Sequence, residues 1–135
     1  MIKTEMQVER DFYSFVKNSK LGKAIRGTVY RSDMRPANAD TEDLVIKFLA
    51  GLDEQVQTGV VIFNLYVPDI PHNNGRKVPN KKRIGELQEL ILSFVETAGD
   101  TEYWLETDTT PTSMKSEDIE QHFIYARIKF NRITE

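Results

Sequence analysis

Two histidines, His72 and His122, are the side chains in this sequence best suited to proton transfer near neutral pH. Each has a carboxylate close in sequence, Asp69 for the first and Glu120 for the second, which could help it bind a metal or act as a base. The spacing of the two histidines matches no metal-ligand motif, so we expect no metal site and interpret both as surface or strand-edge residues. A histidine-based enzyme would need a pocket in which one of them approaches a carboxylate.

Other signatures of catalysis are missing from the sequence. The chain has no cysteine, which excludes thiolate nucleophiles, disulfides and cysteine-based zinc sites. No serine or threonine lies in a nucleophile-elbow pattern, and no glycine-rich loop for phosphates or dinucleotides occurs. Paired carboxylates do occur, at Glu42 with Asp43 and at Glu117 with Asp118, but polar sequence surrounds them and we interpret them as solvated charge. We therefore expect a protein that is not an enzyme and uses no cofactor.

Positive charge is concentrated in one short stretch that leads into a predicted helix. The members of this cationic cluster are Arg76, Lys77, Lys81, Lys82 and Arg83. Cations at a helix N-terminus oppose the helix dipole, at a cost of roughly 0.3–1 kcal/mol each. Since local stability would favour acids there, we take the cluster as the candidate interface or DNA-facing group. A merely solvated cluster is the alternative.

The charge of the chain is distributed unevenly. Residues 1–83 contain 14 Lys and Arg against 10 Asp and Glu, whereas residues 84–135 contain 4 against 11. If the cationic cluster and the acidic region from Glu96 to Glu120 lie at opposite sides of the domain, copies of the chain could join head to tail. Such an interface closes into a ring when the rotation between copies permits it.

The composition is that of an ordinary globular chain. It has 135 residues, of which 39% are hydrophobic and 29% charged, which is typical of one domain with its own core. No apolar run approaches the ~20 residues of a membrane-spanning helix, and no signal peptide is visible. We expect a single domain, residues 1–135, in the cytoplasm, with no membrane contact.

Two segments have the apolar period of an amphipathic helix. The first covers about residues 5–18, and the polar residues that follow, up to Gly22, end it. The second covers residues 80–98, with Asn80 as its N-cap and Gly99 as its stop.

Five segments have the composition of β-strands, and they cover residues 28–31, 43–49, 55–67, 102–107 and 122–130. A turn at Gly51, Asp53 and Glu54 separates the second from the third. The third is apolar on both faces, which is typical of a central strand covered on two sides. The fourth is followed by a polar, turn-rich stretch over residues 108–116.

This order of elements predicts an α+β fold. Consecutive strands with short links favour antiparallel pairing, and two helices are enough to cover one face of the sheet. We therefore expect a mainly antiparallel sheet of four to five strands with two helices packed on one face. Residues 68–79, which are rich in proline and asparagine, are predicted to be an exposed, irregular loop long enough to have a function.

The pattern of elements resembles the tail-terminator and tail-completion proteins of long-tailed phages and prophages. The segments that carry the resemblance are Glu42-Asp43-Leu44-Val45-Ile46, Val61-Ile62-Phe63-Asn64-Leu65-Tyr66-Val67-Pro68-Asp69 and the strand opening His122-Phe123-Ile124. The resemblance implies a structural virion component that caps the tail tube as a ring, typically of six copies, and contacts the head connector. In such rings charged loops face a neighbouring subunit or the lumen through which DNA passes.

The resemblance leaves alternatives open. Head-tail connector proteins of similar size match the pattern almost as well. From a different class, a small nucleic-acid-binding or regulatory domain would use the cationic cluster for phosphates and exposed Tyr66 or Tyr125 for stacking. Our first expectation is a homo-oligomeric tail-assembly protein that contacts other tail or connector proteins, with non-specific DNA contact as an additional role.

Overall fold

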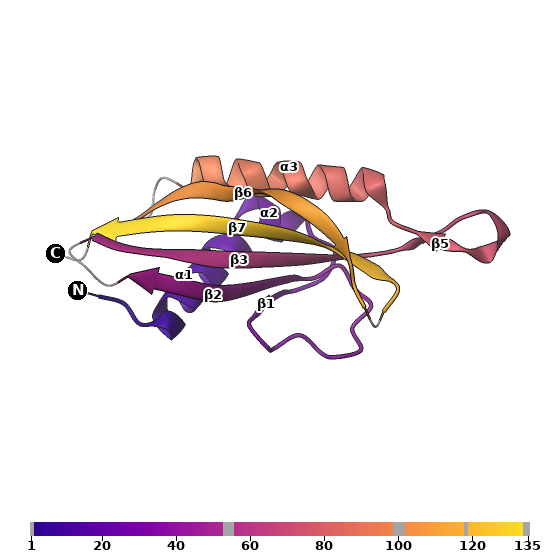
Figure 1. Ribbon diagram of the computed structural model, residues 1–135. Helices are drawn as coiled ribbons and strands as arrows, with labels where there is room; N and C mark the ends of the chain where they lie inside the picture. Colours follow the sequence, from indigo (N-terminus) through magenta and orange to yellow (C-terminus); the bar gives the residue numbers. More distant parts are fainter. Residues whose placement is uncertain (1, 53–55, 99–101, 118, 134–135) are drawn as a thin grey trace.

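Five strands form the main sheet of this protein, and the helices lie on one of its faces (Figure 1). The computed structural model describes residues 2–52, 56–98, 102–117 and 119–133. The helices are α1 (Glu5–Lys17), α2 (Lys20–Ala24) and α3 (Lys81–Thr97), with a 3-10 turn, η1, at Asn73–Gly75. The strands are β1 (Val29–Arg31), β2 (Leu44–Leu52), β3 (Val56–Pro68), β4 (Ile70–Pro71), β5 (Lys77–Val78), β6 (Tyr103–Lys115) and β7 (Gln121–Ile133).

The strand order is β1-β2-β3-β7-β6, and every pair except the first is antiparallel. The predicted α+β fold with a mainly antiparallel sheet is confirmed. The expectation of antiparallel pairing is wrong for β1 and β2, which run parallel with Val29 opposite Leu44. The reason is the length of the connection over residues 32–43. A parallel pair needs about a dozen residues between its strands, because the chain must return to the end of the sheet from which the first strand started.

β6 is longer than the sequence predicts. It continues through residues 108–115, which we expected to be rich in turns. Its register with β7 shifts twice between Thr107 and Thr112. These irregularities accommodate Pro111, which cannot donate to a regular ladder, while the threonines around it favour extended backbone.

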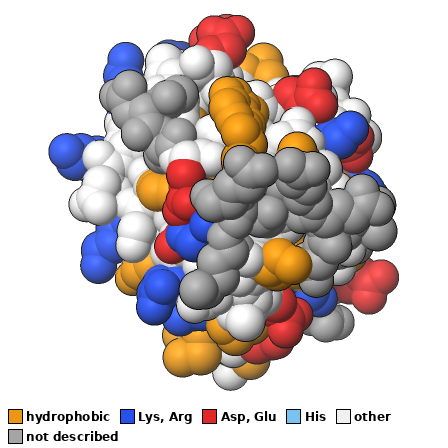
Figure 2. Space-filling view, turned by 90° about the vertical axis from the view of Figure 1, so that its left-hand side faces the viewer, with side chains coloured by type: hydrophobic (Ala, Val, Ile, Leu, Met, Phe, Trp, Pro, Cys, Tyr) orange, Lys and Arg blue, Asp and Glu red, His pale blue; other side chains and the backbone are white. Residues whose placement is uncertain are grey.

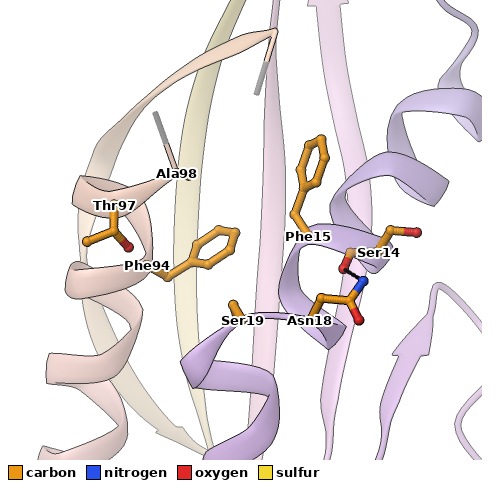
Figure 3. A pocket seen from close by; sticks show the side chains of 7 residues that line it. All are labelled: Ser14, Phe15, Asn18, Ser19, Phe94, Thr97 and Ala98. Carbon is orange, nitrogen blue, oxygen red and sulfur yellow. Dashed lines mark hydrogen bonds between the residues drawn. The ribbon is translucent and has the colours of Figure 1, made fainter. Parts of the chain in front are cut away.

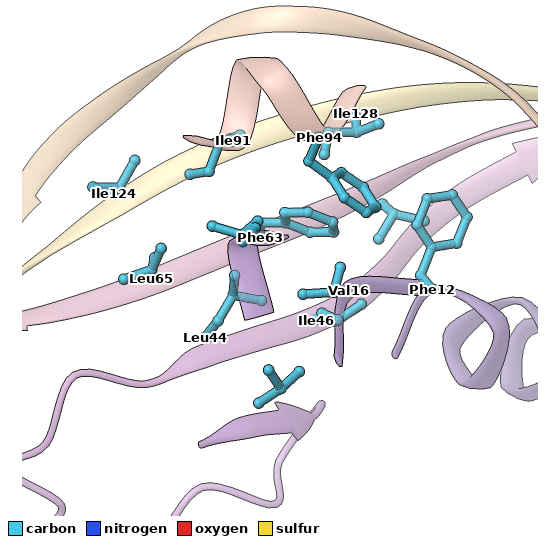
Figure 4. Close-up of a cluster of buried hydrophobic side chains, with 14 of the residues drawn as sticks. Phe12, Val16, Leu44, Ile46, Phe63, Leu65, Ile91, Phe94, Ile124 and Ile128 are labelled. Carbon is cyan, nitrogen blue, oxygen red and sulfur yellow. The ribbon is translucent and has the colours of Figure 1, made fainter. Parts of the chain in front are cut away.

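The core lies between the inner face of the sheet and the helices (Figure 4). From α1, the ring of Phe12 packs on Phe130 and Tyr103, with centroid distances of 5.8 and 5.2 Å. From α3, the ring of Phe94 lies 5.6 Å from that of Phe63. Because Phe63 and Phe130 both point to the inner side of the sheet, α1 and α3 cover the same face.

The helix boundaries follow local signals only in part. Asn80 caps α3 as predicted, since its Oδ1 accepts a hydrogen bond from the Arg83 amide. The short helix α2 is not predicted by the sequence. Ser19 caps it, and Gly22 approaches α1 so closely that an added Cβ would lie 2.0 Å from the carbonyl oxygen of Val16.

Some predicted boundaries fall on residues that are not described. The helix stop at Gly99 and the turn residues Asp53 and Glu54 lie outside the described residues. Gly51, which we assigned to that turn, belongs to β2, so this strand is longer than the predicted 43–49.

No helix of the described residues lies over the outer face of the sheet (Figure 1). β3 is the central strand, as predicted, but the expectation that both of its faces are covered is wrong. Its inward residues Val61, Phe63 and Leu65 are fully buried, whereas on the other face Val60 and Tyr66 are partly exposed and only Ile62, at 8% exposure, is buried among its apolar residues. The apolar residues on that second face therefore lack a covering layer within the described chain.

Candidate functional site

Residues 69–80 form an arm that projects beyond the end of α3 (Figure 1). β4 and β5 pair within it, and the chain turns through η1 between them. The turn places Asn74 and Gly75 at φ values of 67° and 73°, a left-handed backbone that asparagine and glycine adopt most readily. The loop that we predicted to be irregular is therefore a small two-stranded ribbon, and it is exposed from residue 71 to residue 77.

Asp69 fastens the base of the arm to the end of the sheet. Its amide donates a hydrogen bond to the Glu120 carbonyl oxygen at 3.0 Å, and its Oδ1 lies 2.7 Å from Nδ1 of His122. A second link joins Lys77 to the Glu120 carboxylate at 2.7 Å. The sequence suggested Asp69 as a partner of His72, but the structure pairs it with His122.

The contact between His122 and Asp69 meets one requirement of a histidine-based active site. His122 also borders a pocket of about 460 Å³, together with Lys81 and Lys115. In the described part of the chain, however, no serine or threonine hydroxyl donates to His122. No group of three or more potential metal ligands occurs among the residues that the structure describes. What the structure shows of this pair is a contact between the base of the arm and β7.

The cationic cluster is divided by the structure. Three members are exposed and form no ion pair with any described residue: Arg76, Lys81 and Lys82. Lys77 is exposed as well, and its hydrogen bond to Glu120 raises the pKa of Lys77. Arg83 points away from these four, into the body of the protein.

Arg83 closes a buried ion pair with Glu42. Its Nε and Nη2 donate to the two carboxylate oxygens at 2.7 and 2.8 Å, and Nη2 also donates to the carbonyl oxygen of Ala24. The two side chains are only 13% and 4% exposed. Burial raises the pKa of Glu42, but hydrogen bonds and charge from Arg83 and Arg26 lower it more, so that it lies below its ordinary value of 4.5. The guanidinium of Arg83 is thus engaged within the chain.

The interpretation of Glu42 and Asp43 as solvated charge is wrong. Asp43 is fully buried, and its carboxylate accepts hydrogen bonds from the Thr28 amide at 2.8 Å, from Arg35 Nε at 3.0 Å and from the Thr41 hydroxyl. A buried carboxylate is stable only when such partners replace water. The polar sequence around the pair supplies these partners rather than solvent exposure.

The acidic region from Glu96 to Glu120 is largely paired with cations of the same chain. The pairs are Glu102 with Arg132, Glu106 with Lys129, Asp108 with Arg127, and Glu120 with Lys77. Asp118 lies outside the described residues. On α3, by contrast, the exposed Glu89 and Glu96 have no ion pair with a described residue. Glu117 is exposed and unpaired in the same sense, so the acidic surface that remains for a partner lies on α3 and at Glu117.

The outer side of the sheet, which we call the open face, carries apolar side chains together with basic and acidic ones, and Arg127 and Lys129 form their ion pairs with Asp108 and Glu106 there. Its exposed apolar members are Val56, Trp104, Met114 and Ile133, at 43%, 57%, 43% and 49% exposure. Tyr66 and Phe123 lie side by side on it, 5.6 Å apart. The space-filling view of the end where β3 begins and β7 ends shows hydrophobic side chains at the surface among charged ones (Figure 2). The exposed apolar side chains form two groups at opposite ends of the long strands, Val56, Trp104 and Ile133 at one end and Met114 with Tyr66 and Phe123 at the other.

A pocket of about 580 Å³ lies between the ends of α1 and α3 (Figure 3). Phe15 and Phe94 form its apolar part, and Ser14 and Asn18 are joined by a hydrogen bond from the Asn18 side chain to the Ser14 carbonyl oxygen. None of its lining residues is titratable, so this pocket offers no acid or base.

The chain matches no protein-family model and no curated protein sequence. Within the described residues, no helix is both long enough and apolar enough to cross a membrane.

Proposed function

We propose that this protein is a structural subunit of a phage or prophage tail, a tail terminator or tail-completion protein that assembles as a ring at the head-tail junction. The pattern of the sequence supports this role, and the shape of the arm supports self-assembly. An arm that leaves the body, with Arg76 at its tip and Lys81 and Lys82 at its base, adds nothing to the core. Its use lies in contact with another molecule.

The observation that carries the proposal is this exposed cationic arm. A two-stranded ribbon with so little contact to its own body is costly to order, and a partner that binds it offsets that cost. In the proposed ring the arm meets an adjacent subunit or another tail or connector protein.

Binding of nucleic acid is the second candidate function, since Arg76, Lys81 and Lys82 are free to contact phosphates. With Arg83 engaged by Glu42, at most a few phosphate contacts come from this cluster, so DNA binding would be weak and would fall with salt. Salt-dependent DNA binding by the isolated monomer would favour this candidate over assembly.

We expect reversal of Lys81 and Lys82 to glutamate to weaken assembly without loss of the fold. Both side chains are exposed, and acids in the first turn of α3 stabilise the helix by about 0.3–1 kcal/mol each. Light scattering after gel filtration should show smaller particles than wild type, and electron micrographs should lose their rings. Thermal unfolding of the variant should be unchanged or slightly higher.

The matched control is reversal of Lys20 and Lys23, which are exposed on α2 and lie outside the cluster. It changes the net charge by the same amount and should leave the particle size as in wild type. Unchanged rings in the Lys81 and Lys82 variant would remove the cluster from the interface. A wild-type chain that stays monomeric at high concentration, at any salt, would contradict the proposed role.

A further inference from the structure

The open face is large enough to be an interface. β3, β6 and β7 have 13 residues each. At ~3.3 Å per residue and ~4.8 Å between strands, these three strands and β2 span roughly 600–800 Å². That is close to the ~800 Å² that each partner contributes to a standard protein–protein interface.

The chemistry of the open face describes the partner that fits it. Trp104 is exposed on this face beside Asn131 of β7, and Lys47, Arg127 and Lys129 lie on β2 and β7. Arg127 and Lys129 pair with Asp108 and Glu106 of β6, so among these three cations only Lys47 has no ion pair with a described residue. A complementary partner is an elongated element with apolar side chains and carboxylates.

α3 presents such a surface on its outer side. Glu86, Glu89, Ser93 and Glu96 recur at helical spacing and are exposed, and Leu92 between them is 39% exposed. Glu86 forms one long ion pair, with a distance of 3.6 Å between its Oε1 and Nη1 of Arg83. The last turn of α3 contains no basic residue, although cations would be favoured there by the helix dipole. The interaction with the helix dipole therefore does not explain why carboxylates occur on this side of α3.

We infer that the outer side of α3 in one copy packs on the open face of the next copy. This inference rests on the self-assembly in the proposed function and adds a second contact between neighbouring copies to that of the arm. Helix on sheet is the usual way to cover an apolar sheet face, and the inner face of the same sheet is covered in that way. The carboxylates of Glu89 and Glu96 are then available to Lys47, and Leu92 packs against apolar side chains of the open face.

The two surfaces belong to opposite layers of the subunit, the sheet and the helices. An interface between them is heterologous, so each copy uses one surface for each neighbour and the series closes into a ring if the rotation permits. α3 has 17 residues, which gives a length of about 26 Å, enough to lie along the central part of the long strands.

A charge exchange between two variants tests this interface. The sheet variant carries Lys47→Glu, and the helix variant carries Glu89→Lys with Glu96→Lys; all three side chains are exposed and have no ion pair with a described residue. Each variant alone places like charges in its own interface, so we expect self-association at least about tenfold weaker than wild type. An equal mixture should recover assembly, because each interface between a sheet variant and a helix variant again joins opposite charges.

Three results would overturn the inference. One is normal assembly of either variant alone, and another is a mixture that remains dissociated while wild type assembles. In both cases the proposed function stands, because wild type still forms its oligomer through other surfaces. The third is a wild type that never assembles, and this result removes the proposed function as well.

The single tryptophan gives an independent readout of the open face. Trp104 is the only tryptophan of the chain and is 57% exposed in the single subunit. We expect its emission to shift to the blue as wild type assembles, and Trp104→Ser to weaken assembly. Met34→Ser, at a side chain that is 66% exposed and lies outside the sheet, is the matched control and should assemble normally. Assembly without any shift of the emission would contradict burial of this face.

Discussion

Replacement of Arg83 by alanine is expected to lower the free energy of unfolding by about 3–5 kcal/mol, because it leaves the buried carboxylate of Glu42 without its charge partner. The same change at Lys82, the adjacent and exposed member of the cluster, should alter it by no more than about 0.5 kcal/mol. Urea unfolding followed by circular dichroism measures both variants. Equal stability of the two variants would contradict a structural role for Arg83.

The pH dependence of these variants adds a second test. In wild type the pKa of Glu42 is depressed in the folded state, so its contribution to stability is present above pH 4.5 and is lost as the pH falls through the lower, folded-state pKa. Without Arg83, burial raises the pKa of Glu42, and the folded state then gains relative stability as the carboxylate takes up a proton. The difference in stability between wild type and Arg83→Ala should therefore begin to shrink above pH 4.5, where the folded variant takes up its proton, and shrink further below pH 4.5 as wild type loses its contribution.

Arg83 also shows how far sequence reasoning can go at the candidate site. Its place next to Lys81 and Lys82 led us to group all of them as one cationic surface. The partner, Glu42, is distant in sequence and belongs to the segment before β2, so no local pattern could separate Arg83 from its neighbours. The exposure of Arg76, Lys81 and Lys82 could be predicted, because a solvated side chain needs no partner from a distant part of the sequence.

The fold was more accessible to prediction than the site. The helical period places Phe12 and Phe94 in the core, and strand alternation places Ile128 and Phe130 there, because each pattern reports directly on burial. The parallel pairing of β1 depends on where the chain returns after residues 32–43, and alternation carries no such information.

The open face was partly visible in the sequence. Apolar residues on both sides of β3, such as Val60 and Ile62 beside Val61 and Phe63, predicted a second covered face. The helices of the described chain cover only one face of the sheet. The apolar residues on the other face of β3 therefore predicted a covering layer that the single subunit does not supply. In physical terms, the pattern records apolar surface to be buried, but it cannot say whether the same chain or another copy buries it.

Asp43→Ala should destabilise the protein as strongly as the loss of Arg83. The carboxylate of Asp43 is fully buried, and its removal leaves Arg35, with a side chain only 10% exposed, without a counter-charge, at a cost of about 3–5 kcal/mol. The Thr28 amide, which donates to Asp43 at 2.8 Å, should exchange its hydrogen faster.

Because the guanidinium of Arg35 lies 3.9 Å from the ring of Tyr66 on the open face, the Asp43→Ala variant should assemble less well even under conditions where it remains folded. Asp40→Ala, at an exposed position of the same connection, is the control and should change stability by no more than about 0.5 kcal/mol. If urea unfolding and amide exchange are the same in both variants, Asp43 does not hold the connection between β1 and β2.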